Sequence, residues 1–92
     1  MSVYVDSANI PFRDTLMCHM VADSEEELHA MATSLGMERC WHQKPGTHHS
    51  HYDIPIAKKA AALRLGAIEV SRRQLAMFLR QRRRTLSLDA SY

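Results

Sequence analysis

The sequence predicts an α/β domain with a small four-stranded, mostly parallel sheet and about three helices, in the order β-β-α-β-α-β-α. Short β-rich stretches alternate with longer stretches whose apolar residues recur at helical spacing. Strands joined in this way through helices form right-handed crossovers, which makes the later strands parallel. Ninety-two residues leave room for one domain, which we expect over residues 1–84. Residues 85–92 have no clear period and are expected to form a mobile tail.

Two strands are expected before the first helix. In residues 2–5 the two valines alternate with other residues, which predicts a first strand with both valines on one face. Residues 6–14 are predicted as a loop because they contain Asn9 and Pro11. Residues 15–22 carry apolar side chains on both faces, which is typical of a central strand covered twice. We therefore place residues 15–22 near the middle of the sheet.

Capping signals mark the first and the last helix. Ser24 and Glu27 form a capping box, and the apolar residues that follow recur at helical spacing as far as Gly36. Ser71 and Gln74 form a second capping box before a stretch with inward-facing apolar residues. Both patterns predict helices that begin directly after the serine.

Between these helices the sequence predicts a strand, a loop, a helix and a short strand. Residues 38–43 are the predicted third strand and lead into a histidine-rich loop. Asp53 is expected to cap the second helix, with Pro55 in its first turn, where a missing N–H costs little. Gly66 ends this helix, and residues 67–70 form the fourth strand.

Charge is distributed unevenly along the chain. Residues 1–71 carry six Lys and Arg against nine Asp and Glu, whereas residues 72–92 carry six Arg against one Asp. A basic segment of this kind favours a phosphate backbone as its partner, with affinity that falls as salt rises. The alternative is a solvated helix end, where arginine also suits the negative end of the helix dipole.

The remaining composition indicates a cytoplasmic protein. The N-terminus lacks the basic start and apolar run of a signal peptide, and no apolar stretch reaches the ~20 residues of a membrane span. Cys18 and Cys40 have no paired spacing, so two reduced thiols are expected. An open sheet edge in so small a subunit favours a homodimer.

The candidate site is the histidine-rich loop. Four of the six histidines lie within ten residues, between His42 and His51, and Pro45 and Gly46 mark a turn among them. Segments that follow strands meet at one edge of an α/β sheet, where ligands bind. The loop is therefore expected to meet the residues that follow the other strands.

Imidazole binds divalent metal ions and carries protons near neutral pH. The catalytic candidates are His19, His51 and Asp53. The candidates for holding a divalent metal ion, Zn²⁺ or Mn²⁺, are His19, His48, His51 and Asp53. The ligand-binding candidates are Asp6, Trp41, Tyr52, Lys58, Arg72 and Arg73.

Each of these candidates also has an ordinary structural explanation. His19 would be a hydrogen-bonded core histidine, Asp53 a plain helix cap, and the loop a solvated polar segment. His29 follows Glu25 by four residues and is expected to be its surface ion-pair partner.

Several segments are distinctive in combination: Val3-Tyr4-Val5-Asp6, Cys18-His19-Met20-x-Ala22-Asp23, Glu27-Leu28-His29-x-Met31-Ala32, Trp41, His51-Tyr52-Asp53-Ile54 and Gly66-Ala67-x-Glu69. Together they resemble a small family of bacterial and phage-borne domains of unknown function, over roughly residues 1–75. The resemblance implies a compact domain and brings no activity with it. His48, His49 and the arginines of residues 80–84 look like features of this member.

Three functions fit these observations. The first is binding of a phosphate-bearing ligand, either a nucleotide or a nucleic acid, in a histidine-rich pocket at the strand ends. The second is a metal-assisted hydrolase or nuclease with His19, His51 and Asp53 around the ion. The third is a phage or host accessory protein that acts by protein contact through the arginine-rich helix.

Overall fold

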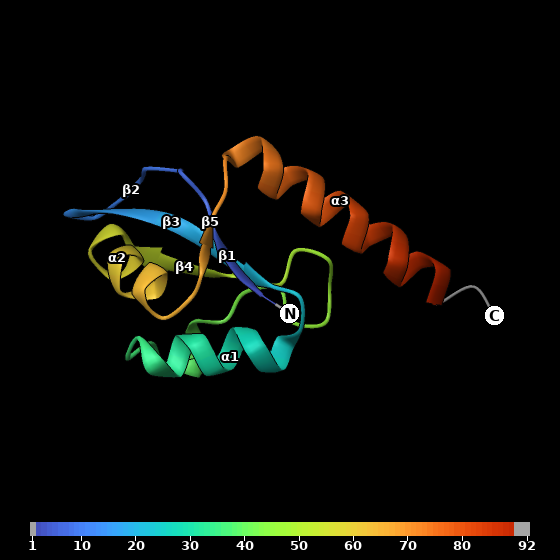
Figure 1. Cartoon of the computed structure of the whole chain (residues 1–92), viewed down its shortest axis with the longest axis horizontal. Helices are drawn as coiled ribbons and strands as arrows, with labels where there is room; N and C mark the ends of the chain where they lie inside the picture. The colour runs from blue at the N-terminus through green and yellow to red at the C-terminus, as the bar shows by residue number, and fades with distance from the viewer. Residues whose placement is uncertain (1, 90–92) are drawn as a thin grey trace.

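A mixed sheet lies between two helices on one face and one helix on the other (Figure 1). The computed structural model describes residues 2–89. Within them the strands are β1 (Val3–Val5), β2 (Ile10–Phe12), β3 (Thr15–Ala22), β4 (Tyr52–Pro55) and β5 (Ile68–Glu69). The helices are α1 (Glu25–Ser34), α2 (Ile56–Arg64) and α3 (Arg72–Asp89), with a 3-10 helix η1 (Arg39–Trp41). The predicted α/β class is confirmed.

β3 is the centre of the sheet, as its two apolar faces predict. It pairs antiparallel with β1, β2 and β4, whereas β1 and β5 form the parallel pair. The expected mostly parallel order is therefore inexact. The chain returns through α1 to lay β4 antiparallel beside β3, and α2 then carries it across to β5.

A bulge interrupts the strand formed by β1 and β2. Val5 lies opposite Met20 and Ile10 lies opposite Met17, so this side of the ladder holds two extra residues. The predicted loop at residues 6–14 is thus partly the short strand β2. The bulge begins at Asp6, whose N–H still donates to the His19 carbonyl at 3.1 Å.

The predicted third strand at residues 38–43 is wrong. These residues form η1, and only Gln43 makes a bridge, to His51. The strand that pairs with this side of β3 is instead β4, in which Ile54 lies opposite Cys18. Pairing here buries Ile54 and its strand neighbour Tyr52, and this gain outweighs the local capping signal. Asp53 is therefore a strand residue, and Pro55 is the N-cap of α2.

Both capping boxes are confirmed. The Ser24 hydroxyl accepts from the Glu27 N–H at 3.1 Å, and the Ser71 hydroxyl accepts from the Gln74 N–H at 3.0 Å. α3 continues through the start of the predicted tail to Asp89, and residues 90–92 lie outside the described part of the chain.

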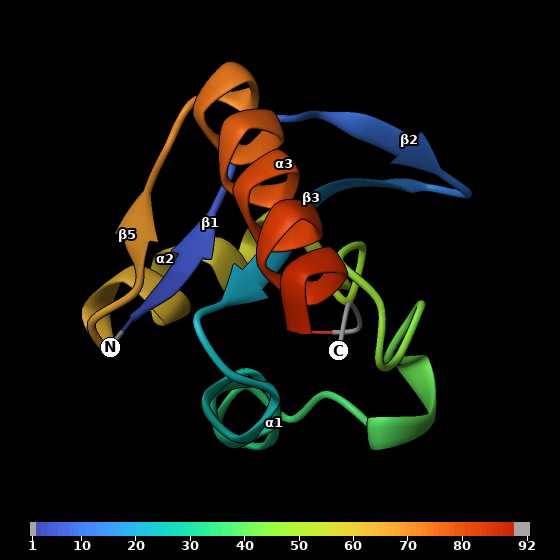
Figure 2. The same cartoon turned by 90° about the vertical axis from the view of Figure 1, so that its right-hand side faces the viewer.

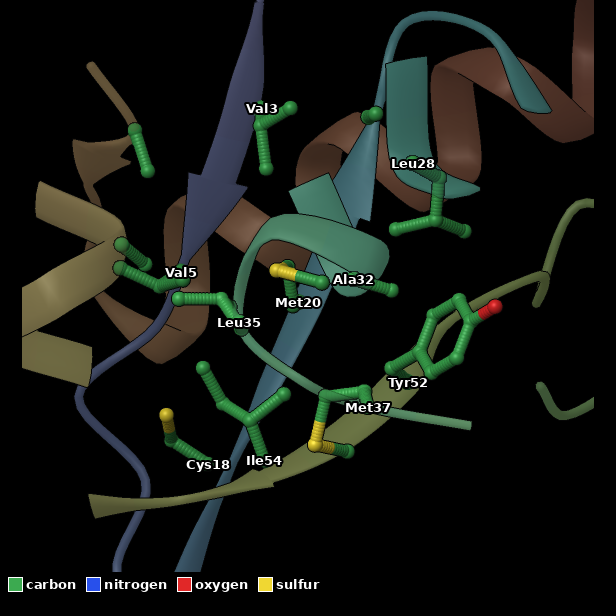
Figure 3. Close-up of a cluster of buried hydrophobic side chains, with 13 residues drawn as sticks. Val3, Val5, Cys18, Met20, Leu28, Ala32, Leu35, Met37, Tyr52 and Ile54 are labelled. Atoms are coloured by element: carbon green, nitrogen blue, oxygen red, sulfur yellow. The ribbon is translucent and has the colours of Figure 1, made fainter. Parts of the chain in front are cut away.

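The core lies between the sheet and the helices α1 and α2 (Figure 3). It contains Val5 from β1, Met20 from β3, Ile54 from β4 and Leu28 from α1. Figure 2 shows α3 crossing the opposite face of the sheet, where its Phe78 ring lies 5.1 Å from the ring of Tyr4. Among the described residues, no helix combines the length and apolar character needed to cross a bilayer.

Candidate metal centre

The alternation of β4 divides the stretch from His51 to Asp53 between the two faces of the sheet. Tyr52 points into the core and is 1% exposed. Asp53 points to the face that carries α3, directly opposite His19 on β3. The His51 ring comes to this same face, with its centroid 5.5 Å from that of His19. His19, His51 and Asp53, called here the His–Asp site, thus form one group.

Each imidazole of the His–Asp site is fixed by its Nδ1 atom. Nδ1 of His19 lies 2.7 Å from the Asp6 carboxylate, and Nδ1 of His51 lies 2.5 Å from the His49 carbonyl oxygen. Because an ionised carboxylate and a carbonyl only accept hydrogen bonds, Nδ1 must carry the hydrogen in both rings. Both Nε2 atoms then face Asp53 Oδ1, at 3.8 Å from His19 and 3.3 Å from His51.

Asp6 is buried behind His19 rather than exposed at the site. Its Oδ1 accepts from the N–H groups of His19, at 2.9 Å, and Ala8, at 3.2 Å. Burial alone would raise the pKa of Asp6, but the hydrogen bonds from His19 and Ala8 outweigh it and lower this pKa. Asp6 therefore remains a carboxylate that holds the His19 ring.

Asp53 and His51 form an ion pair at the open side of the site. Contact with His51, supported by a 2.7 Å hydrogen bond from Gln43, lowers the pKa of Asp53. The same contact raises the pKa of His51 and outweighs the effect of burial. The side chains of His19 and Asp53 remain 29% and 34% exposed, so an ion or a small ligand can reach them.

Arg82 of α3 holds the loop that carries His51. Its guanidinium donates to the Ser50 carbonyl at 3.2 Å and to the Ala22 carbonyl at the end of β3. The loop is thereby tied to the strand that carries His19. A helix far along the chain positions the site.

A groove of about 690 Å³ adjoins the His–Asp site. Asp53 lines it, together with Trp41, which is 48% exposed, and Phe12, which is 53% exposed. Arg13 and Lys58 line it as well, but the Lys58 ammonium also donates to the Leu35 carbonyl at 2.7 Å. The groove is thus a partly apolar surface with aromatic side chains and positive charge, and it reaches the His–Asp site at Asp53; among the described residues, the one histidine that lines it is His42.

Several predicted site residues lie elsewhere. Tyr52 is on the opposite face because neighbouring residues of a strand point to opposite sides. The His48 ring packs against that of His49, with centroids 4.0 Å apart, and is not among the side chains grouped with His51. Arg72 and Arg73 are exposed in the first turn of α3; in the described part of the chain they neither line the groove nor contact the His–Asp site.

A second group of polar side chains was not predicted as a site. Glu25, His29 and His42 lie on the core side of β4, with Tyr52. The four-residue spacing from Glu25 to His29, which puts both on one side of a helix, was its sequence signal. The predicted pair of His29 with Glu25 is present, at 3.6 Å, but its predicted place on the surface is wrong, because the His29 side chain is mostly buried.

The fold and the two histidine groups define a class of protein: a small α/β domain with one group of His and carboxylate side chains on each side of β4. The chain belongs to the family described as "Protein of unknown function (DUF4031)", whose model matches residues 3–82. The predicted resemblance to a family of unknown function is confirmed. No curated protein and no solved structure matches the chain.

Proposed function

We propose that the chain binds one divalent metal ion, Zn²⁺ or Mn²⁺, at the His–Asp site and uses it to hydrolyse a phosphate ester. The observation that carries this proposal is the orientation of the two imidazoles. Each has its Nδ1–H engaged by an acceptor, so when an ion takes the place of any proton on Nε2, both Nε2 lone pairs face the same ion beside Asp53. Metal-binding histidines are oriented in this way by carboxylates and backbone carbonyls.

The spacing of the three ligand atoms supports a metal ion. Ligands about 2.0–2.2 Å from a tetrahedral zinc ion lie about 3.3–3.6 Å from one another. Asp53 Oδ1 lies 3.3 Å from Nε2 of His51 and 3.8 Å from Nε2 of His19. All three ligand atoms lie within 4.8 Å of one another, so side-chain movements of up to about 1.5 Å would close them around one ion.

The donor set also suits catalysis. Two imidazole nitrogens and one carboxylate oxygen leave a fourth position for water or substrate, and zinc in such sites lowers the pKa of its bound water to about 7. In the hydrolysis, the water oxygen forms a bond to phosphorus, the ester P–O bond breaks, and the alkoxide that leaves takes up the proton that the water has lost. The exposed fractions of His19 and Asp53 support access of the substrate to this position.

The groove supports a nucleotide or a nucleic acid as the phosphate ester. Trp41 and Phe12 can stack on bases, and the Arg13 guanidinium can pair with phosphate. Because Asp53 belongs both to the groove and to the His–Asp site, a ligand in the groove would bring its phosphate beside the ion. The alternative function, binding of a nucleotide or nucleic acid without a metal ion, would use the same groove.

Metal content and hydrolysis, measured on the same preparations, test the proposal. We expect wild-type protein exposed to Zn²⁺ or Mn²⁺ and then desalted to retain one equivalent more than His51→Ala and Asp53→Ala. Cleavage of bis(4-nitrophenyl) phosphate, and of a short single-stranded oligonucleotide, should fall to background in both variants. The matched control is His48→Ala, which removes another loop histidine and should leave both measurements unchanged.

Equal metal retention in His51→Ala and His48→Ala would overturn the metal site. A retained ion without cleavage of either substrate would overturn the hydrolase. Oligonucleotide binding that survives treatment with EDTA, with no hydrolysis at any stage, would support the metal-free binder instead.

A further inference from the structure

A second cluster, formed by Glu25, His29 and His42, lies on the other face of β4. Nε2 of His42 lies 3.2 Å from Glu25 Oε2, and Nε2 of His29 lies 3.6 Å from the same oxygen. The two rings meet edge to face, with centroids 4.6 Å apart. Both nitrogens therefore point at one carboxylate, as they do at the His–Asp site.

We propose that Glu25, His29 and His42 bind a second divalent cation of the Zn²⁺ type, independently of the His–Asp site. The two nitrogen–oxygen distances lie close to the separation of about 3.3–3.6 Å between the ligands of a tetrahedral zinc ion. Glu25 and His29 are one helical turn apart on α1, and His42 follows η1, so the ion would join the helix to this segment.

Tyr52 supports the proposal by its place behind His29. Its hydroxyl lies 2.7 Å from Nδ1 of His29, and its ring is buried in the core. With a cation on Nε2, the Nδ1–H of His29 donates to this hydroxyl, which fixes the ring as a partner outside the ligand shell does. The Tyr52 ring also stacks on His42, at 5.3 Å between centroids.

Burial indicates a structural ion rather than a catalytic one. The side chains of His29 and His42 are 13% and 9% exposed, whereas that of Glu25 is 47% exposed and leaves a route for the ion. The mostly buried imidazoles leave little access for a substrate, although three protein ligands leave a fourth position that water can fill. Ser50 Oγ lies 2.7 Å from Nε2 of His42, so an ion bound to this nitrogen would take the place of that hydrogen bond.

The alternative is a network of hydrogen bonds without an ion. Ser50 and Glu25 both approach Nε2 of His42, and in the described residues no buried side-chain nitrogen or oxygen lacks a partner. In that case the same side chains would stabilise the fold but bind no metal. Metal stoichiometry separates the two possibilities.

The experiment is a Zn²⁺ titration of the full chain, with bound metal counted after desalting. We expect two equivalents in wild type and in His48→Ala, and one equivalent in His42→Ala and in Glu25→Gln. Glu25→Gln guards against misfolding, because Glu25 is exposed and the capping bond of α1 comes from Ser24. Far-UV circular dichroism checks that each variant is folded.

The two proposals fail in different ways. One equivalent in wild type, lost in His51→Ala and kept in Glu25→Gln and His42→Ala, would overturn the second site and leave the first. One equivalent kept in His51→Ala and lost in Glu25→Gln would overturn the first site and support the second. No bound zinc in wild type would overturn both.

Discussion

Asp6→Asn is the most informative single substitution, because it changes a hydrogen bond behind the His–Asp site without changing side-chain size. Oδ1 of Asp6 accepts from the N–H groups of His19 and Ala8, and Oδ2 accepts from Nδ1 of His19. In the variant, the amide oxygen keeps the two backbone bonds. The amide NH₂ then faces Nδ1, so the His19 ring must place its hydrogen on Nε2 instead.

The expected cost follows from this change of tautomer. A hydrogen on Nε2 of His19 points at Asp53 and removes one of the three metal ligands. Loss of a partner of this kind weakens metal binding by about 10- to 100-fold. That range corresponds to about 1.4–2.8 kcal/mol of binding free energy. Replacing the charge-assisted bond should also lower the free energy of unfolding by about 1–3 kcal/mol.

The assay is competition for Zn²⁺ against a chromophoric chelator, with ¹⁵N NMR of the imidazoles to identify the tautomer of His19. The matched control is Asp14→Asn, which removes an exposed carboxylate from the turn between β2 and β3. We expect the control to bind zinc as wild type does. Wild-type affinity in Asp6→Asn, with the hydrogen of His19 still on Nδ1, would refute the role assigned to Asp6.

Three further substitutions or modifications test other parts of the structure. Arg82→Ala should lower the free energy of unfolding in urea by about 1.5–3 kcal/mol, because buried carbonyls lose a charged donor. Cys18 is fully buried, which raises its pKa to about 11, so a thiol reagent at pH 8 should modify only Cys40 in the native protein. Tyr52→Phe should cost about 0.5–1.5 kcal/mol of stability through the lost hydrogen bond to His29, and should leave hydrolysis unchanged.

Arg82→Ala has a matched control variant. Arg83 is exposed on α3, and Arg83→Ala should change the free energy of unfolding by less than about 0.5 kcal/mol. An Arg82→Ala variant as stable as Arg83→Ala would contradict the role of Arg82 in holding the loop that carries His51. Equal labelling rates for the two cysteines would contradict the burial of Cys18, and reduced hydrolysis in a folded Tyr52→Phe would contradict the separation of the two faces.

Local patterns predicted the elements whose signals are local. The capping boxes at Ser24 and Ser71 located α1 and α3, because a cap depends on residues three apart. The apolar character of residues 15–22 on both faces predicted the central position of β3. Length and the alternation of elements predicted the α/β class.

Local signals misled the prediction where long-range strand pairing decides the structure. Asp53 and Pro55 suggest a helix start, but their segment pairs with β3 and becomes β4. The sequence contains no information on this register, and a shift by one residue would have turned Asp53 into the core and Tyr52 outward. For the same reason the sequence did not separate the histidines into two groups.

The candidate site was predicted in its members and not in its arrangement. His19, His51 and Asp53 were chosen by residue type, and the structure brings them together through the pairing of β3 with β4. The role of Asp6 in holding the His19 ring depends on a bulge that no local pattern reveals. The position of His29 on α1 predicts a surface residue, because it does not show that His42 and Tyr52 pack against the ring.

Crystals of the zinc-loaded protein, measured at the zinc absorption edge, would test the metal site most directly. An anomalous difference map should show a peak about 2.0–2.2 Å from both Nε2 atoms, of His19 and His51, and from a carboxylate oxygen of Asp53. Full occupancy of zinc elsewhere on the chain, with no peak between these three side chains, would contradict the proposed metal centre.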